Sequence, residues 1–172
     1  MAMNTEIGFG GSCHWCTEAI FLSLKGVKSV KQGWIASAED LSRLSEAVLV
    51  RFDPELIPLQ TLVSVHLHTH SCTSAHSMRD KYRSAVYAFN AGQQTLVLAI
   101  IQALQQEFTE PIITEVIEFG TFKLNSPEYR NYYYADPEKP FCRNVVNPKL
   151  IQLLKDFSAD VDPEKLDHLK GE

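Results

Sequence analysis

Two cysteines, Cys13 and Cys16, lie where the sequence pattern changes from a strand to a helix. Residues 7–9 form the apolar end of a predicted strand, and residues 19–24 carry apolar side chains at the spacing of an amphipathic helix. Between them, the glycines at positions 10–11 favour a tight turn. The sequence therefore predicts a thiol at the first turn of a helix.

A thiol in that position is suited to nucleophilic chemistry. The unpaired N–H groups and the positive dipole end of a first helical turn stabilise a thiolate, which brings the pKa of a cysteine below its ordinary value of about 8.5. We therefore interpret Cys13 as a nucleophile. Cys16 lies one turn later on the same face and is a candidate resolving thiol, which would trap an oxidised Cys13 as a disulfide.

The composition is typical of a globular domain without an obvious polyanionic or membrane partner. The chain has 172 residues, 45% of them hydrophobic, and a formal net charge of -5. We expect a single catalytic domain over residues 1–158 and a charged, flexible tail over residues 159–172. The sequence shows no basic patch, signal peptide or long apolar run, which predicts a cytoplasmic protein that binds neither nucleic acid nor membrane.

A glutamate begins a predicted strand on its apolar side. In residues 46–52 the period-2 pattern puts Glu46 on the same face as Val48, Val50 and Phe52. Burial disfavours a charged carboxylate, so a buried glutamic acid can stay protonated and donate a proton near neutral pH. Glu46 is a candidate general acid, although a solvated glutamate at a strand start is the commoner situation.

Histidines and a cysteine gather in one polar segment, which raises the question of a metal. His66, His68, His70, Cys72 and His76 include the residue types that bind zinc. Their spacing differs from that of the common zinc fingers, and no matching Cys-x-x-Cys pair follows. We therefore expect helix-end and loop histidines, without a metal or another cofactor.

The order of the predicted elements is strand, helix, two strands, helix, strand, helix, strand. This order favours an α+β fold, a two-layer sandwich with helices packed on a mixed sheet in the manner of a ferredoxin-like plait. We expect strands near 7–9, 27–34, 46–52, 82–89 and 112–117, with a loop over 35–45 between the second and third strands. Besides the helix that follows Cys13, we expect helices over 58–68, 93–107, 127–134 and 147–157.

Several of these segments resemble, in the same order, the A-type peptide methionine sulfoxide reductases, whose marker is a Gly-Cys-Phe-Trp turn that opens a helix. The resemblance extends over about residues 5–155. The matching segments surround Cys13 and Glu46 and continue to the end of the domain: residues 11–21, 46–54, 69–70, 82–85, 111–115, 129–133, 140–142 and 145–149.

The resemblance implies a role for each matching residue. The nucleophile falls on Cys13, the general acid on Glu46, a pocket indole on Trp15, and a hydrogen-bond donor to the sulfoxide oxygen on Tyr82. Enzymes of this family reduce the S epimer of methionine sulfoxide, free or in oxidised proteins, through a cysteine sulfenic acid and a disulfide. Thioredoxin regenerates the thiols, and neither metal nor organic cofactor takes part. The implied biology is protein repair under oxidative stress.

This sequence departs from the family pattern at positions around the implied site. His14 replaces the phenylalanine after the nucleophile, Trp34 replaces a pocket tyrosine, and Ser77 and Lys81 replace an aspartate and a glutamine. We expect His14, Trp34 and Ser77, with the pocket indole, to contact the substrate. A protonated His14 beside the nucleophilic thiol would lower the pKa of that thiol further.

Three thiols remain candidates for the resolving role. Cys16 has the short spacing, Cys72 lies on the loop before Tyr82 where the family has a proline, and Cys142 lies in a C-terminal segment that could fold back over the site. Disulfide geometry is strict, and two sulfurs in one helical turn must satisfy it, whereas a tail can move. This argument slightly favours Cys142.

Other functions are compatible with parts of the pattern. A Cys-x-x-Cys at a helix start is also the device of thioredoxin-like thiol-disulfide oxidoreductases, in which Glu46 and Tyr82 would have no role. A metal-binding or redox-sensing module would use Cys13, His14 and Cys16 with the loop histidines. A homologue that binds a sulfoxide with little turnover is the last alternative.

Overall fold

The computed structural model describes residues 5–169, apart from the side chain of Ser77. Within this range the strands are β1 (Glu6–Gly10), β2 (Val27–Ser37), β3 (Ser45–Phe52), β4 (Ala85–Ala88) and β5 (Glu115–Leu124). The α-helices are α1 (His14–Leu22), α2 (Leu59–His68), α3 (Ala91–Leu104), α4 (Tyr132–Ala135) and α5 (Asn147–Asp156). A 3-10 helix covers Ser77–Asp80, and a π-helix covers Cys142–Val146 directly before α5.

The strands form one mixed sheet that closes into a barrel in the order β1-β3-β2-β5-β4. Neighbours are antiparallel except β4 and β5, which are parallel. The prediction of helices on a mixed sheet is thus confirmed, but the sheet is closed, whereas a two-layer, ferredoxin-like plait has an open one. Close approach of β2 and β5 permits this closure, since a Cβ on Gly33 would clash with the carbonyl of Lys123.

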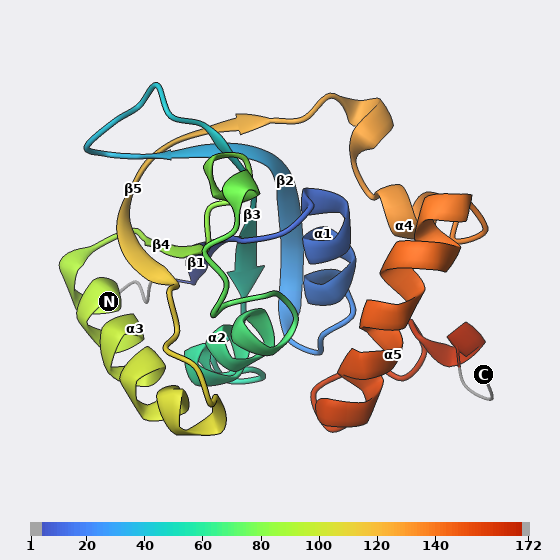
Figure 1. Cartoon of the computed structure of the whole chain (residues 1–172). Coiled ribbons are helices and arrows are strands. Elements are labelled where there is room, and N and C mark those ends of the chain that lie inside the picture. Colours follow the sequence, from blue (N-terminus) through green and yellow to red (C-terminus); the bar gives the residue numbers. More distant parts are fainter. Residues whose placement is uncertain (1–4, 170–172) are drawn as a thin grey trace.

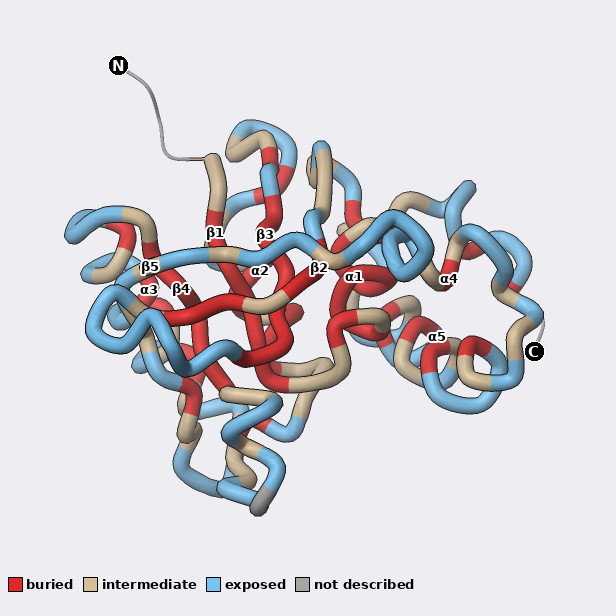
Figure 2. Tube along the Cα trace, turned by 90° about the horizontal axis from the view of Figure 1, so that it is seen from above, coloured by how far each residue is buried: buried red, intermediate tan, exposed pale blue. Residues whose placement is uncertain are grey.

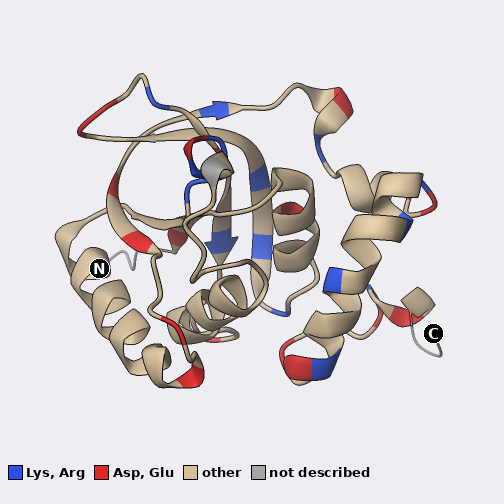
Figure 3. Ribbon diagram, in the orientation of Figure 1, with Lys and Arg blue, Asp and Glu red and all other residues tan. Residues whose placement is uncertain are grey.

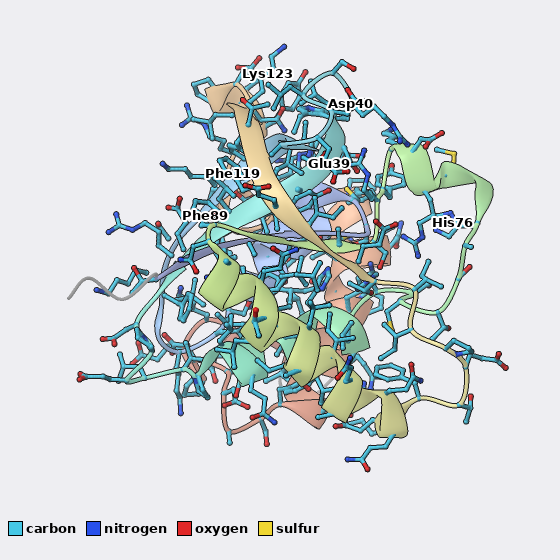
Figure 4. All side chains as sticks on the ribbon, turned by 90° about the vertical axis from the view of Figure 1, so that its left-hand side faces the viewer. Glu39, Asp40, His76, Phe89, Phe119 and Lys123 are labelled. Carbon is cyan, nitrogen blue, oxygen red and sulfur yellow. The ribbon has the colours of Figure 1, made fainter. Side chains whose placement is uncertain are left out.

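Strands β1 and β3 and helix α1 are buried over most of their length (Figure 2). Their apolar side chains belong to two buried clusters, one inside the barrel and one between the barrel and the helices. The smaller cluster lies inside the barrel and consists of Ile35, Ala47, Leu49, Ala85 and Tyr87. Phe89 and Phe119 stack beside it with ring centroids 4.5 Å apart, and Figure 4 shows the two labelled rings next to each other. The larger cluster holds the inner faces of the helices against the outside of the barrel.

Helix α1 lies between the barrel and the C-terminal helices (Figure 1). Its Phe21 stacks on Phe9 of β1 with centroids 4.6 Å apart, which fixes the helix against the strand that leads into it. The expected flexible tail is described as far as Leu169. Val161, Leu166 and Leu169 are buried there, and Val161 bridges Leu24, so these residues pack onto the domain through apolar contacts.

The boundaries of several elements differ from those expected. The segment predicted as a loop over 35–45 begins with the end of β2, which runs to Ser37. The strand expected over 82–89 is shorter, and the strand expected over 112–117 starts later and continues to Leu124. The predicted helix over 127–134 is a 3-10 turn followed by the short α4. Tertiary pairing decides these bounds, because β2 and β5 extend each other beyond their local signals.

Lys and Arg are interspersed with Asp and Glu along most of the ribbon, whereas residues 84–122, which include α3 and most of β5, carry acidic residues and no Lys or Arg (Figure 3). Among the described residues, no helix is long and apolar enough to cross a membrane.

Candidate active site

Cys13 lies at the junction of β1 and α1, as the sequence predicts, and is the N-terminal cap residue of α1. It is partly exposed and lines a cavity of about 620 Å³ together with Cys16, Tyr82, Phe141 and residues of the loop before Tyr82. The pKa of Cys13 is lowered to about 7, first by a hydrogen bond from the Cys16 thiol and then by the backbone N–H groups of Trp15 and Cys16. Burial and the charge of Glu46 oppose this lowering.

The turn before Cys13 is held by two stacked histidines. His66 Nε2 donates to the carbonyl of Gly10 at 2.7 Å, and its ring lies 4.2 Å from the ring of His70. His70 in turn contacts Gly11, whose φ is 146° and where an added Cβ would meet His70 Cδ2 at 2.5 Å. Burial lowers the pKa of both histidines, that of His70 to about 4, so both are neutral structural groups.

Glu46 is buried at the start of β3, directly opposite Trp34 of β2. Its side chain faces α1 and not the barrel interior, as the alternation along the strand predicts. Oε1 lies 3.2 Å from His14 Nε2, and Oε2 lies 3.8 Å from Lys81 Nζ. Oε2 has no hydrogen-bond partner among the described residues. A buried carboxyl group, one oxygen of which makes no hydrogen bond to the described residues, therefore lies close enough to Cys13 to influence its pKa.

Tyr82 lines the same cavity and is positioned by an arginine. Arg79 donates through Nη1 to the carbonyls of Gly11 and Tyr82 at 2.9 and 2.8 Å, and through Nε to the carbonyl of Ser74 at 2.8 Å. It thus joins the loop that carries Tyr82 to the turn that precedes Cys13. The pKa of Tyr82 is raised, mainly by burial, so its hydroxyl is protonated at neutral pH and can donate a hydrogen bond.

Trp15 belongs to an aromatic group formed by α1 and the C-terminal segment. Its indole stacks on Tyr132 with centroids 4.0 Å apart and makes an edge contact with Phe141 at 5.5 Å. Its Nε1 is buried without a hydrogen-bond partner among the described residues. Trp34 contacts His14 edge to face, and the centroids of the two rings lie 5.7 Å apart.

The remaining thiols differ in their relation to Cys13. A hydrogen bond between the Cys16 and Cys13 thiols, together with burial, raises the pKa of Cys16. Cys16 is therefore the thiol of the pair that keeps its proton. Cys142 is fully buried in the π-helix and is close enough to influence the ionisation of Cys16. Cys72 is buried under the loop before Tyr82. No disulfide joins any of the four.

The structure thus brings Cys13, Glu46, Tyr82 and His14 together, as the sequence predicts. One expectation fails, because burial lowers the pKa of His14 and leaves this residue neutral, so it does not act as a cation on Cys13. The side chain of Ser77 lies outside the described residues. Arg79 was not predicted, because the segment that contains it is polar, shows no hydrophobic periodicity and includes no recognisable motif.

Comparisons with known proteins find matches over most of this chain. The family model described as "Peptide methionine sulfoxide reductase" matches residues 5–161. The "Peptide methionine sulfoxide reductase MsrA" of Deinococcus radiodurans is 32% identical over 88% of this chain and 82% of its own length.

Solved structures share the fold at lower identity. Reduced Mxr1 from Saccharomyces cerevisiae superimposes with a TM-score of 0.70 at 20% identity over 80% of this chain and 88% of its own. Mxr1 in complex with Trx2 gives a TM-score of 0.59 at 18% identity over 72% of this chain and 81% of its own. The match of the family model over most of the chain shows that this chain belongs to the peptide methionine sulfoxide reductase family.

Proposed function

We propose that this protein reduces methionine S-sulfoxide, free or in oxidised proteins, with Cys13 as nucleophile and Glu46 as general acid. The observation that carries the proposal is a cysteine whose pKa is about 7, at the start of α1, beside a buried glutamate. Near neutral pH such a cysteine supplies the thiolate, while the buried carboxyl group can supply a proton.

The reduction step balances with these two groups. The Cys13 thiolate takes the oxygen from the sulfoxide, so the methionine sulfur gains two electrons and the cysteine sulfur loses two. The proton of Glu46 passes to that oxygen. The products are methionine, a sulfenic acid on Cys13 and the Glu46 carboxylate. The overall charge is the same before and after the step.

The surrounding side chains fit roles in binding the sulfoxide. The Tyr82 hydroxyl, which lines the cavity with Cys13, can donate a hydrogen bond to the sulfoxide oxygen. Trp15 and Trp34 offer apolar ring surface on two sides of His14, and we assign them with His14 to the substrate site. We also assign Ser77 to the substrate site.

A second thiol then condenses with the sulfenic acid, which gives a disulfide and one water molecule. The mobility argument from the sequence favoured Cys142. The folded chain favours Cys16, because a hydrogen bond from its thiol is the largest influence on the pKa of Cys13, whereas Cys142 is not among the groups that shift this pKa. We therefore propose Cys16 as the first resolving thiol, with Cys142 and Cys72 as the alternatives.

An external dithiol must return the disulfide to two thiols. We propose thioredoxin as this reductant, because a solved relative of the same fold, yeast Mxr1, is seen in complex with Trx2. The corresponding location is the cytoplasm, and residues 1–158 would act as a single catalytic domain.

Stoichiometric turnover tests the proposal. Reduced protein mixed with excess S-sulfoxide, without any dithiol, is expected to form one methionine per chain and a disulfide that mass mapping places between Cys13 and Cys16. The Cys13→Ser variant is expected to form none. A Cys13–Cys142 disulfide would overturn only the choice of resolving thiol.

Thiol-disulfide exchange is the second candidate, and the Cys13–Cys16 hydrogen bond is the observation that favours it. Insulin disulfides reduced by this protein, with no methionine formed from either sulfoxide epimer, would replace the sulfoxide reductase with an exchange enzyme.

A further inference from the structure

The hydrogen-bond directions around His14 fix the position of its proton. Nδ1 lies 3.2 Å from the carbonyl oxygen of Gly33 in β2. A carbonyl oxygen only accepts, so Nδ1 carries the hydrogen in this contact. Burial lowers the pKa of His14 and favours the neutral ring, which has one hydrogen. Nε2 is then the nitrogen with a free lone pair.

A chain of amides leads to the same conclusion from the other side. Gln32 Nε2 donates to the carbonyl oxygen of Tyr129 at 2.7 Å, which fixes the orientation of that amide. Gln32 Oε1 therefore accepts from Asn125 Nδ2, at 2.6 Å. The same Nδ2 lies 3.1 Å from His14 Nε2 and has a second hydrogen for it. The protein thus presents a donor to Nε2, as a neutral ring with its hydrogen on Nδ1 requires.

Glu46 Oε1 lies 3.2 Å from the same Nε2. An ionised carboxylate there would face the lone pair of the ring, and both side chains are buried, with 7% of the His14 and 6% of the Glu46 side chain exposed. A proton on Oε1 turns this repulsion into a hydrogen bond to Nε2. The single lone pair of Nε2 then accepts from both Glu46 and Asn125, and the ring stays neutral.

We propose that His14 is a positioning residue that shares the proton of Glu46 through its Nε2 and holds the general acid in its protonated form beside Cys13. This inference rests on the proposed function. In each cycle the pair gives its proton to the sulfoxide oxygen through Glu46. When an external dithiol reduces the disulfide, Cys13 returns as a thiol, and transfer of its proton to Glu46 restores both the thiolate and the protonated pair.

Other charged and titratable groups around the pair act in both directions. The Lys81 ammonium, 3.8 Å from Glu46 Oε2, favours the carboxylate, but this lysine side chain is 49% exposed and its effect is screened by water. The Cys13 thiolate favours the protonated acid, because two adjacent anions repel. Tyr82, with its pKa raised, stays neutral and adds no charge.

Nuclear magnetic resonance can observe the proton directly, without reference to activity. In reduced protein labelled with nitrogen-15 in histidine and carbon-13 in the glutamate carboxyl group, Glu46→Gln assigns the Glu46 signal. We expect the Nδ1–H form of His14 in the wild type. In His14→Phe, which has no ring nitrogen to accept the proton, we expect the Glu46 carboxyl signal to show the ionised form at a lower pH than in the wild type.

The chain contains a matched control. His68 and Glu107 form a second histidine–glutamate pair at 2.9 Å, but on the surface, so His68→Gln should leave the Glu46 titration as in the wild type. Deprotonation of Glu46 at the same pH in His14→Phe and wild type would overturn the inference. A wild-type His14 ring with its hydrogen on Nε2 beside an ionised Glu46 would also overturn the inference. This observation is made on the wild type and does not depend on whether a variant folds.

Methionine formation in the same samples separates the two proposals. If the protein forms methionine but Glu46 loses its proton at the same pH in the wild type and in His14→Phe, only the shared proton is refuted. A protein that forms no methionine refutes the proposed function, whereas the spectra still report whether His14 and Glu46 share a proton.

Discussion

Replacing Cys16 with alanine removes the largest influence that lowers the pKa of Cys13, the hydrogen bond from the Cys16 thiol. The pKa of Cys13 is about 7, below the ordinary value of a cysteine, while burial and, when it is ionised, Glu46 act to raise it. Without the bond only the backbone N–H groups oppose these two effects. We therefore expect the pKa of Cys13 in Cys16→Ala to rise to about 8 or above.

The change alters the thiolate population in a defined direction, because the thiolate forms as the pH rises through the pKa. At pH 7 a pKa of about 7 leaves roughly half of Cys13 ionised, and a rise of one unit leaves roughly a tenth. Alkylation of Cys13 at this pH should slow about fivefold, and the difference should vanish at high pH. The assay is the rate of iodoacetamide labelling against pH, with the modified cysteine identified by mass spectrometry.

Cys16→Ser is the matched control, because a serine hydroxyl can still donate to the Cys13 sulfur. Its alkylation profile should resemble that of the wild type more closely than that of Cys16→Ala. An unchanged profile in Cys16→Ala would refute the reasoning, since it would mean that the helix start and its N–H groups alone activate Cys13.

Three further predictions follow from the same geometry. Gly11→Ala should lower the free energy of unfolding by about 2 kcal/mol or more, because the new Cβ would meet His70. Gly92→Ala on α3, where the new Cβ would only reach ordinary contact with Asn90 Oδ1 at 3.4 Å, should be neutral or stabilising in the same urea titrations. Between pH 8 and pH 5, His70 should lower the free energy of unfolding by about 2 kcal/mol. Its pKa is about 4 in the folded chain and 6.5 in the unfolded chain, so the unfolded chain binds the proton first as the pH falls. His70→Asn should therefore make the free energy of unfolding less dependent on pH, and an equal pH dependence in both proteins would exclude this role of His70. Tyr82→Phe should lower the single-turnover rate of methionine formation about tenfold or more and leave the alkylation of Cys13 unchanged, and a full rate would remove Tyr82 from the mechanism.

The sequence predicted where Cys13 and Glu46 lie in the fold better than it predicted the shape of the sheet. The position of Cys13 follows from local signals, a strand end, two glycines and a helical pattern, and the structure keeps all of them. The burial of Glu46 follows from the alternation along a single strand. The closed barrel depends on which strands pair over long separations, such as β2 with β5, and a period of two does not contain that information.

The hydrogen-bond network around the site was not predictable for the same reason. His14, Gln32 and Asn125 are far apart in sequence, and each is an ordinary polar residue in its own segment. The pairing of β2 with β5 brings Gln32 and Asn125 together, and Asn125 contacts His14, which lies beside Glu46. The expectation of a cationic His14 failed because burial in a folded site could not be weighed from the sequence neighbours of Cys13.

The most direct test of the account is the epimer-resolved reduction of a blocked methionine sulfoxide with dithiothreitol, in the wild type, Cys13→Ser and Glu46→Gln. We expect consumption of the S epimer alone, its loss in Cys13→Ser and a reduced rate in Glu46→Gln. Folded, reduced wild-type protein that consumes neither epimer would contradict the assignment of this site to sulfoxide reduction.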